Sequence, residues 1–444
     1  MLRRSGFALV LCLVSGLLSG CSLFPSYFGT SNKIPLPGKR VPILASETTL
    51  KPDPTLASAP VLLPVPYVNP TWPETGGYPS HAMYHLALGP TPHEIWRTSV
   101  GEAGYENTGL FAEPVVGGGR VYTMDAYPDV DAIDAKSGRH LWRIDLKPSR
   151  MQSGVVGGGL AYSYGTIYAT TAYGQVFAIS AKTGKVLWHY TAGIPFRSGP
   201  TVDGARVYAI TNDNQLYAFS AKDGKVLWSY IGVPEPAVMV GGASPAVADG
   251  VVVAAFSSGD LVALRADDGS VLWTTPLVRP QRSSAVGTIT DIDGEPVIDR
   301  GRIFAISHAG IMASVDLQTG ERIWVKDVSG VQTPWAAGEF VYVVTTKGEV
   351  LCVSAADGRI KWNTQLSQYL DAKDKTGLIV WRGPLLAGNR LILVSNYGYA
   401  VVLSPYTGEL LGEMKLSGSA SLPPVVANKT LYILTNNATL IALQ

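Results

Sequence analysis

The stretch AISAKTGKVLW, residues 178–188, returns about forty residues later as AFSAKDGKVLW, residues 218–228. The same theme, an apolar run, a turn with a glycine and a final apolar run, occurs elsewhere in the chain. Seven copies have the turn glycine four residues before their end, at Gly138, Gly184, Gly224, Gly269, Gly320, Gly358 and Gly408. Successive glycines are 38 to 51 residues apart, and a period of this size is typical of a repeat architecture.

One copy with its upstream sequence, GTIYATTAYGQVFAISAKTGKVLW at residues 165–188, predicts three strands joined by two turns. Large apolar residues alternate with small or polar ones in IYAT and QVFAIS, as they do in half-buried strands. AYG predicts a hairpin and KTG a second turn, because glycine adopts a positive φ without strain. The next unit opens with PTVDGARVYAI, where D-G again separates two strands. Each unit therefore predicts four antiparallel strands, the size of one β-propeller blade.

Two positions of the repeat have a predictable packing role. Six of the seven copies end in tryptophan, and we expect this ring to fill the wedge between neighbouring blades. The position six residues before the turn glycine is mostly small, as expected where blades crowd together; it holds Ala132, Ala178, Ala218, Ala263, Ser314, Cys352 and Val402. Because Cys352 stands where other copies have alanine, we predict a buried, unreactive thiol rather than a nucleophile or a metal ligand.

The ends of the repeat region predict how the ring closes. An eighth copy, KTLYILTNNATLIALQ, supplies strands with Ala442 in the small position, and then the chain stops. PHEIWRTSV places Trp96 four residues after Pro92, which is the spacing of a terminal strand. An N-terminal strand that completes the last blade would leave no open edge between the first and last units. We therefore predict an all-β fold, an eight-bladed propeller of four-stranded antiparallel blades over residues 93–444.

The N-terminus, MLRRSGFALVLCLVSGLLSGCS, has two arginines and a short apolar run, which predicts a signal peptide over residues 1–20. Its end, Leu-Ser-Gly-Cys, resembles the lipobox of bacterial lipoproteins, after which Cys21 would be acylated. The alternative is that Cys21 is an ordinary residue near a conventional cleavage site. Ser22 rather than Asp after the cysteine resembles lipoproteins sent to the outer membrane, so we expect a lipid-anchored protein that faces the periplasm.

Residues 21–92 differ in composition from the repeats. The part from Ser22 to Pro92 contains 14 prolines and few strand patterns. Such a composition favours an extended, partly polyproline II tether that can hold the propeller away from a membrane surface. We expect part of its end, around Tyr84 to Leu88, to pack on the propeller.

Charge and motif content exclude several function classes. The chain has 35 Lys and Arg against 34 Asp and Glu, scattered without a basic stripe, so nucleic acid is not an expected partner. No H-E-x-x-H, G-x-S-x-G or phosphate-binding glycine loop occurs. His81 and His85 are four residues apart, but their segment does not predict a helix that would align them on a metal.

The repeat A-x-[DS]-A-x-[TD]-G-x-x-x-W resembles that of pyrroloquinoline-quinone-type propellers, some of which are eight-bladed dehydrogenases. A quinone-dependent dehydrogenase, or another ligand-binding periplasmic propeller, is therefore the alternative function. Those enzymes are characterised by a vicinal Cys-Cys pair and by acidic and amide calcium ligands near the quinone. This sequence has no adjacent cysteines and no loop with several converging oxygen ligands. We predict no catalytic residues, no metal and no cofactor.

Signal, lipobox, tether and repeat together resemble the BamB family of outer-membrane protein assembly factors. The most specific stretch is TITDIDGEPVIDRGRIFAISHAGIMASVDLQTGERIW, residues 288–324, which is similar in order and spacing to that family's D-x-D-x-x-P blade. The resemblance covers the chain from Trp96 onward. It implies a noncatalytic scaffold of the β-barrel assembly machinery, which binds the periplasmic POTRA domains of BamA and works with other components of that machinery.

The resemblance also implies contact residues in two loops between blades. The first loop matches VMVGGASP, residues 238–245, where Met239 and Val240 fall on contact positions; the family often has arginine in place of Val240. The second matches Asp291 and Asp293. The apolar run around Met239 is consistent with a partner surface. Two alternatives remain open: this run is the first strand of the next blade, and the two aspartates cap turns. An interaction module with a different envelope partner is a further alternative function.

Overall fold

The computed structural model describes residues 50–103, 112–149, 157–236, 239, 241–278 and 290–444. These residues belong to the second of two compact units, Thr49–Gln444. The described helical structure is a short 3-10 helix, η2 (Pro54–Leu56), and none of the described helices is long and apolar enough to span a membrane. The rest consists of strands and their connections.

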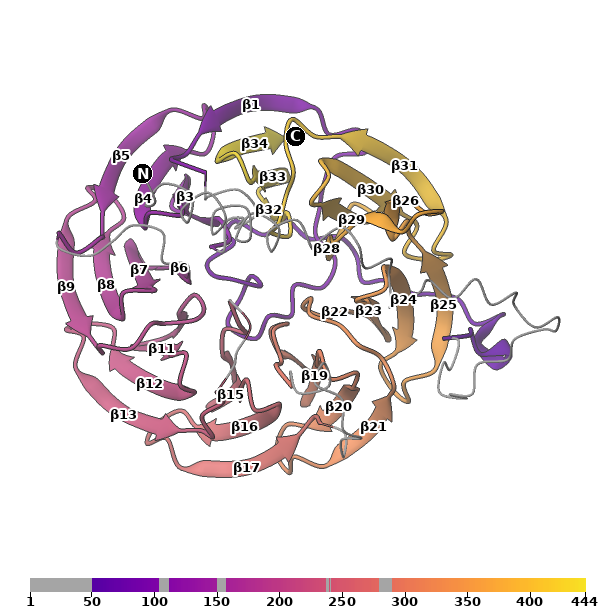
Figure 1. The fold of residues 1–444 in the computed structure, drawn as a ribbon, viewed down its shortest axis with the longest axis horizontal. Helices are drawn as coiled ribbons and strands as arrows, with labels where there is room; N and C mark the ends of the chain where they lie inside the picture. Colours follow the sequence, from indigo (N-terminus) through magenta and orange to yellow (C-terminus); the bar gives the residue numbers. More distant parts are fainter. Residues whose placement is uncertain (1–49, 104–111, 150–156, 237–238, 240, 279–289) are drawn as a thin grey trace, which may run out of the picture. The chain divides into compact units, whose positions relative to one another are not determined.

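Eight four-stranded antiparallel sheets form a ring (Figure 1), as the repeat predicts. In the seven sheets built from four consecutive strands, the first strand lies nearest the centre and the last strand forms the outer rim. The first two blades contain β2 (Val115–Gly117), β3 (Arg120–Met124), β4 (Asp129–Asp134), β5 (His140–Asp145), and β6 (Gly158–Ser163), β7 (Thr166–Thr171), β8 (Gln175–Ser180), β9 (Val186–Thr191). The third and fourth contain β10 (Thr201–Asp203), β11 (Arg206–Ile210), β12 (Gln215–Ser220), β13 (Val226–Ile231), and β14 (Ala246–Ala248), β15 (Val251–Ala255), β16 (Asp260–Arg265), β17 (Val271–Pro276).

The other half of the ring follows the same plan. The fifth and sixth blades contain β18 (Val297–Asp299), β19 (Arg302–Ile306), β20 (Met312–Asp316), β21 (Arg322–Lys326), and β22 (Trp335–Ala337), β23 (Phe340–Val344), β24 (Glu349–Ser354), β25 (Ile360–Gln365). A small hairpin, β26 (Tyr369–Asp371) and β27 (Thr376–Leu378), precedes the seventh blade. That blade contains β28 (Trp381–Ala387), β29 (Arg390–Ser395), β30 (Tyr399–Leu403) and β31 (Leu410–Lys415).

The eighth blade joins the two ends of the repeat region. It combines β32 (Val425–Ala427), β33 (Thr430–Thr435) and β34 (Thr439–Leu443) with β1 (Glu94–Ser99). β1 pairs antiparallel with β34 and places Trp96 opposite Ala442. The predicted closure by an N-terminal strand is therefore confirmed, and the ring has no break between its first and last units.

Each repeat tryptophan lies against the turn glycine of the next blade. A Cβ atom added to Gly224 would lie 2.5 Å from the ring of Trp188, so only glycine allows this contact. The indole Nε1 of Trp188 donates a hydrogen bond to the carbonyl oxygen of Ala221 in the same turn, at 3.0 Å. The same Nε1–carbonyl bond is made by Trp96, Trp142, Trp228, Trp273, Trp324 and Trp362. Tryptophan and glycine recur together because they meet between neighbouring blades.

The small position of the repeat lies directly opposite the tryptophan within each blade. Ala178 pairs with Trp188 across β8 and β9, and Cys352 pairs with Trp362 across β24 and β25. In the seventh blade both positions change together, since the larger Val402 faces Gly412. The Cys352 thiol is buried and free, and burial raises its pKa, as predicted for an unreactive cysteine.

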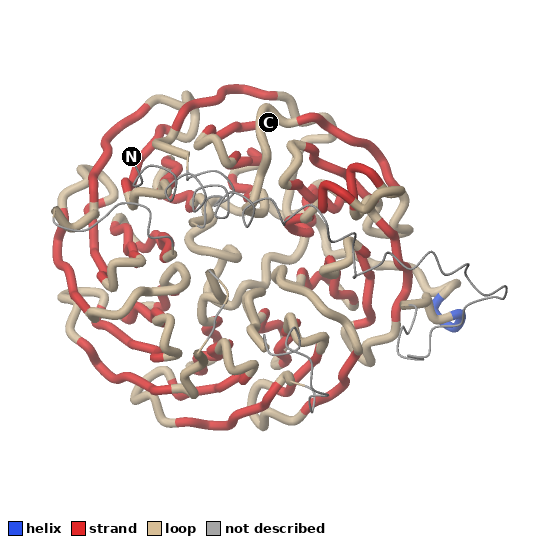
Figure 2. Tube along the Cα trace, viewed as in Figure 1, coloured by secondary structure: helices blue, strands red, loops and turns tan. Residues whose placement is uncertain are grey.

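A segment before the propeller runs around the inside of the ring. We call residues 69–86 the inner belt, visible in indigo within the blades in Figure 1 and as loop in Figure 2. Its backbone or side chains form hydrogen bonds with every blade in turn. The bonds join Asn69 to Asn428, Trp72 to Val116, Pro73 to Tyr162, Glu74 to Val202, Pro79 to Val247, Ser80 to Ile298, Tyr84 to Trp335 and Leu86 to Leu386.

The belt lies along the inner edges of the innermost strands, which have no neighbouring strand on that side. Each of these strands has one free edge that faces the centre, and buried backbone groups need hydrogen-bond partners. The belt supplies partners for backbone groups of several of these strands, such as Val116 and Ile298, and it buries its own Trp72, Met83 and Leu86 to 2% exposure or less. This part of the segment predicted to be a tether is thus packed into the propeller, well beyond the expected contact near Tyr84. Residues 21–49 of that segment lie outside the described part of the chain.

Candidate functional site

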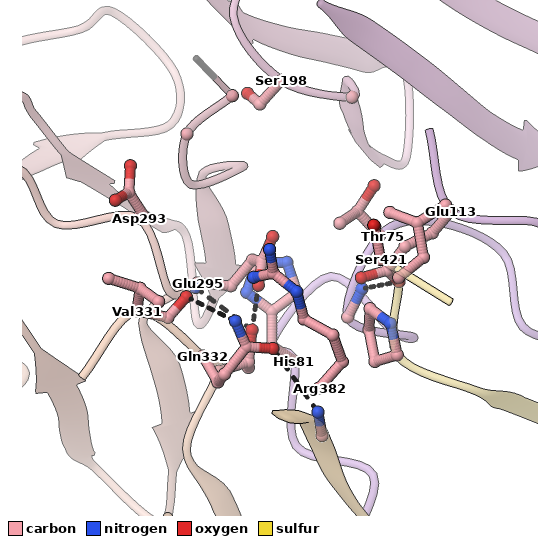
Figure 3. Close-up of a pocket in the computed structure, with 18 of the residues that line it drawn as sticks. Thr75, His81, Glu113, Ser198, Asp293, Glu295, Val331, Gln332, Arg382 and Ser421 are labelled. Carbon is pink, nitrogen blue, oxygen red and sulfur yellow. Dashed lines mark hydrogen bonds between the residues drawn. The ribbon is translucent and has the colours of Figure 1, made fainter. Parts of the chain in front are cut away.

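A cavity of about 610 Å³ lies where the inner belt meets the innermost parts of the blades. The belt contributes Trp72 and His81 to its wall, and the blades contribute charged side chains that include Arg197, Asp293 and Arg382. Figure 3 shows a close-up of this cavity and the elements from which its labelled residues come. Its volume falls in the range of small-molecule sites in proteins, about 300–1,000 Å³.

Arg197, just before β10, connects the two loops that the sequence singled out. Its Nη2 donates to Asp291 Oδ1 at 2.8 Å, and its Nε donates to the carbonyl oxygen of Gly241 at 3.1 Å. Asp291 in turn accepts a hydrogen bond from the backbone N–H of Met239 at 2.7 Å. The loop at 239–245 and the segment at 291–293 are therefore held together, although about fifty residues separate them in the chain.

Met239 lies in a loop before the strand, since β14 begins only at Ala246. Met239 and residues 241–245 precede the strand, so the alternative that this run is the first strand of the next blade is wrong for the described residues. Met239 is half-buried and lines the cavity. Val240 lies outside the described residues, as does Cys21.

The environment of Asp291 differs from both of the positions considered from the sequence, an exposed partner contact and a turn cap. Its side chain is 1% exposed and paired with the equally buried Arg197, so it is not an exposed contact residue. Its oxygens bond to groups in distant segments rather than to its own turn, so it is not a local turn cap either. A buried arginine needs a paired carboxylate, and this need explains the position of Asp291.

Asp293 differs from its neighbour. Its Oδ1 lies 3.6 Å from Arg197 Nη2, and neither carboxylate oxygen has a hydrogen-bond partner within the described chain. Its side chain retains 12% exposure at the cavity. Burial and the neighbouring Asp291 raise the pKa of Asp293 to about 7, against the opposing effect of Arg197. Of the two aspartates, Asp293 is the one available to a ligand or partner.

Two further carboxyl groups in the cavity wall are shifted toward the neutral form. Burial, with the nearby Glu295, raises the pKa of Glu113 to about 8. Burial also raises the pKa of Glu295, although the Thr333 hydroxyl donates a hydrogen bond to it. Low dielectric disfavours the charged form of such groups. Burial therefore disfavours the charged forms of these carboxyl groups in the cavity wall.

The two histidines of the belt segment do not form a metal site. His85 faces the carbonyl oxygen of Pro64 through Nδ1 and accepts the backbone N–H of Asn389 through Nε2, so both ring nitrogens are used. His81 faces the carbonyl oxygen of Pro296 through Nδ1, and burial lowers the pKa of His81 to about 4. Across the described ranges, no group of three or more His, Cys, Asp or Glu side chains could hold a metal ion.

Arg197 and Arg382 are the site residues that sequence reasoning missed. A signal for both existed, because each is the lone charged residue in an uncharged run, TAGIPFRSGPT at 191–201 and LIVWRGPLLAG at 378–388. A charge inside an apolar run indicates burial with a specific purpose. The partner of each arginine could not be read from the sequence, because the repeat pattern does not specify how segments between blades meet.

The chain is similar in sequence to a known protein family. A family model described as "Outer membrane protein assembly factor BamB" matches residues 87–153 and 128–364, which together span more than half of the chain. The chain belongs to the BamB family. The family resemblance derived from the repeat and the DIDGEP stretch is therefore confirmed. The family description names an assembly factor and no reaction.

Individual BamB relatives match over different lengths. The BamB protein of Legionella pneumophila (strain Paris) is 29% identical over 203 residues, which are 46% of this chain and 50% of that protein. The chain thus spans about half the length of this relative. The BamB protein of Salmonella typhimurium is 26% identical over 364 residues, covering 80% of this chain and 89% of that protein.

Solved structures share the propeller fold. BamB from Moraxella catarrhalis superposes with a TM-score of 0.67 at 17% identity, over 80% of this chain and 100% of that chain. A quinohemoprotein alcohol dehydrogenase from Comamonas testosteroni reaches 0.65 at 15% identity, over 84% and 80%. At these identities the likeness concerns the fold alone, so it does not distinguish BamB-like scaffolds from quinone enzymes.

Proposed function

We propose that this chain is a lipid-anchored, noncatalytic scaffold that helps to assemble β-barrel proteins in the outer membrane and binds the periplasmic POTRA region of BamA. Membership of the BamB family is the observation that carries this proposal. The lipobox-like end of the signal, Leu-Ser-Gly-Cys21, supports the anchor and the periplasmic orientation. Acylation anchors a protein by burying its hydrocarbon chains in the bilayer.

The connection between β13 and β14 is the proposed contact surface. Met239 lies in it, Val233 near its start is 59% exposed, and Ile231, the last residue of β13, is 71% exposed. Exposed apolar residues that cluster in one connection are a feature of partner surfaces. The hydrogen bonds of Asp291 to Met239 and of Arg197 to Gly241 fix the positions of these two loop residues, and ordering before binding reduces the entropy lost on binding.

Asp293 completes this proposed surface as its charged element. It lies two residues from the pair that anchors the loop, and its carboxylate has no hydrogen-bond partner in the described residues. A basic side chain of the partner would give it one. Removing one member of a desolvated charge pair of this kind weakens binding by about 2–5 kcal/mol.

Titration calorimetry of the purified propeller against the POTRA region of BamA tests the proposal. Met239→Glu places a charge in the apolar contact, and Asp293→Arg reverses the charge beside it; both are expected to weaken binding at least tenfold. Leu411→Glu is the control, because Leu411 is an exposed apolar residue on the outer strand β31. Equal affinity for wild type and all three variants would refute the surface, and absence of binding by the wild type would refute the partner.

A further inference from the structure

Arg382 is a half-buried cation without a hydrogen-bond or ion-pair partner among the described residues. It lies on β28, and its side chain lines the cavity. No hydrogen bond or ion pair of its guanidinium is formed with the described residues, and its Nε is among the buried nitrogens that lack an acceptor. Burial lowers the pKa of Arg382, but a guanidinium remains charged at neutral pH. A charge that is partly removed from water without a partner is unfavourable, so its presence needs an explanation.

Further buried polar groups in the described part of the cavity wall lack hydrogen-bond partners. They include the Nε2 of His81, the Oγ of Ser198 and both carboxylate oxygens of Asp293. His81 is 3% exposed, and its Nδ1 already faces the Pro296 carbonyl oxygen, so its Nε2 is left as a hydrogen-bond acceptor. Buried polar atoms are nearly always paired, and several such groups around one cavity indicate that something polar occupies it.

The charges in the cavity favour an anion. Arg197 is already paired with Asp291, which leaves Arg382 as the guanidinium without a bonded carboxylate in the described wall. Asp293 is the acid that acts electrostatically on Arg382, and it titrates near neutrality. Glu113 and Glu295 are shifted toward their neutral forms, so they oppose an incoming anion only weakly.

Apolar side chains also contribute to the wall. Trp335, Leu385, Val331, Leu422 and Pro423 line it together with the polar groups. A site with a few placed polar groups and an apolar wall selects ligands that combine an apolar body with polar ends. An arginine fork matches a carboxylate with two parallel hydrogen bonds.

We propose that this cavity binds a small organic acid: a carboxylate held by Arg382, a hydroxyl or amino group that donates to His81, and an apolar or aromatic body against Trp335 and Leu385. The proposal does not depend on the scaffold function, although Met239 and Asp293 of the proposed partner surface also line the cavity, because the ligand contacts assigned here are Arg382, His81, Trp335 and Leu385. The ligand would stabilise the junction of the inner belt with the blades, because belt and blade residues both line the cavity.

The probes are 4-hydroxybenzoate and the longer 4-hydroxycinnamate, with phenol as the matched compound that lacks a carboxylate. Thermal unfolding and calorimetry of the full propeller are measured at constant ionic strength. We expect a saturable rise in melting temperature with at least one hydroxy acid and none with phenol. Absence of a saturable effect with both acids would overturn the proposal and leave the cavity as a water-filled space.

Arg382→Met is the decisive variant, because methionine fills similar space without charge. We expect it to bind the acid at least tenfold more weakly while its ligand-free melting temperature stays equal to or above that of wild type, as expected when an unpaired, partly buried charge is removed. Arg265→Met, on the exposed end of β16, is the control for loss of an arginine. Unchanged affinity in Arg382→Met would contradict the proposal.

A second variant covers the case in which Arg382→Met does not fold. Arg382→Lys keeps the charge but loses the two-pronged geometry, and we expect it to bind the acid more weakly than wild type and to retain the preference over phenol. A crystal structure with 4-hydroxycinnamate then locates the carboxylate. A carboxylate bound away from residue 382 would refute the assignment.

Discussion

Arg197 and Asp291 are 94 residues apart in the chain, yet their side chains form an ion pair of 2.8 Å in which the two are 0% and 1% exposed. The pair connects the segment before β10 with the segment before β18. Asp291 also accepts a hydrogen bond from the backbone N–H of Met239 in the loop before β14. The pair is therefore a structural element beneath the proposed contact surface rather than a part of that surface.

The first prediction concerns this pair. Asp291→Ala leaves the buried Arg197 without its carboxylate, and breaking a buried pair in this way lowers the free energy of unfolding by about 3–5 kcal/mol. Chemical denaturation monitored by tryptophan fluorescence measures the change. Asp293→Ala is the control, expected to change stability much less because Asp293 makes no hydrogen bond in the described structure. Equal stability of Asp291→Ala and wild type would contradict the structural role.

The second prediction concerns pH. The pKa of Asp293 in the folded protein, about 7, is above the value of about 3.9 in an unfolded chain. The folded state thus holds this proton more tightly, so its stabilising contribution is complete below about pH 4 and disappears as the pH rises through 7. Asp293→Asn is expected to flatten the decline in stability between pH 5 and pH 8.

Comparison of the two pH profiles isolates this group from Glu113 and Glu295, whose pKa values are also raised. It also separates Asp293 from His81, whose lowered pKa acts in the opposite direction. Identical slopes for wild type and Asp293→Asn would show that Asp293 is ionised throughout this range.

The third prediction tests the contact between tryptophan and glycine. Gly224 and Gly204 both have positive φ, +71° and +57°, but only Gly224 has a tryptophan ring 2.5 Å from the place of a Cβ, whereas nothing lies within 4 Å of Gly204. Alanine at either site costs about 1–2 kcal/mol of backbone strain. We expect Gly224→Ala to cost about 1–3 kcal/mol more than Gly204→Ala, through overpacking. Equal losses in denaturant titrations would mean that the ring moves aside freely.

The fourth prediction concerns the inner belt. Glu74 is 1% exposed, its Oε2 accepts the backbone N–H of Val202 at 2.8 Å, and burial raises the pKa of Glu74 well above its usual value. A neutral carboxyl resembles an amide, so Glu74→Gln is expected to preserve stability at pH 7. Glu74→Ala leaves the Val202 N–H unpaired at a cost of about 1–3 kcal/mol. Melting curves of both variants measure these changes in stability. A large loss of stability in Glu74→Gln would indicate that Glu74 is ionised.

The fifth prediction concerns the anchor. Cys21→Ala removes the proposed site of acylation, so the folded propeller is expected to leave the outer-membrane fraction and appear in the soluble periplasmic fraction. Cell fractionation in high salt, in cells without BamA, measures this without the contribution of the proposed partner. Retention of Cys21→Ala in the membrane fraction under these conditions would refute the lipid anchor.

Much of the fold follows from the sequence alone, because a repeated local pattern repeats its local structure. The spacing of Gly184 and Gly224 predicts blades of four strands, and Trp96 predicts the strand that closes the ring. These features depend on turns and strand alternation, which neighbouring residues along the chain determine.

Only some residues of the candidate site could be predicted from the sequence. Met239 and Asp293 were identified through a family resemblance, and their relation to Arg197 was not, because the segments between blades have no common pattern. The inner belt shows the same limit. A composition rich in proline predicts an extended chain, and extended chain is what forms at 69–86, but its position inside the ring depends on the unpaired edges of eight innermost strands.

The amino-acid sequence by itself determined the eight blades, their closure and the burial of Cys352, since each depends on a short motif that recurs at a regular spacing. Only the tertiary structure decided that Asp291 is a buried partner of Arg197, that Asp293 and Arg382 line one cavity, and that the proline-rich segment completes the interior. The physical reason is that a buried charge or an open strand edge is satisfied by whichever group the closed ring brings beside it, and that group lies far away along the chain.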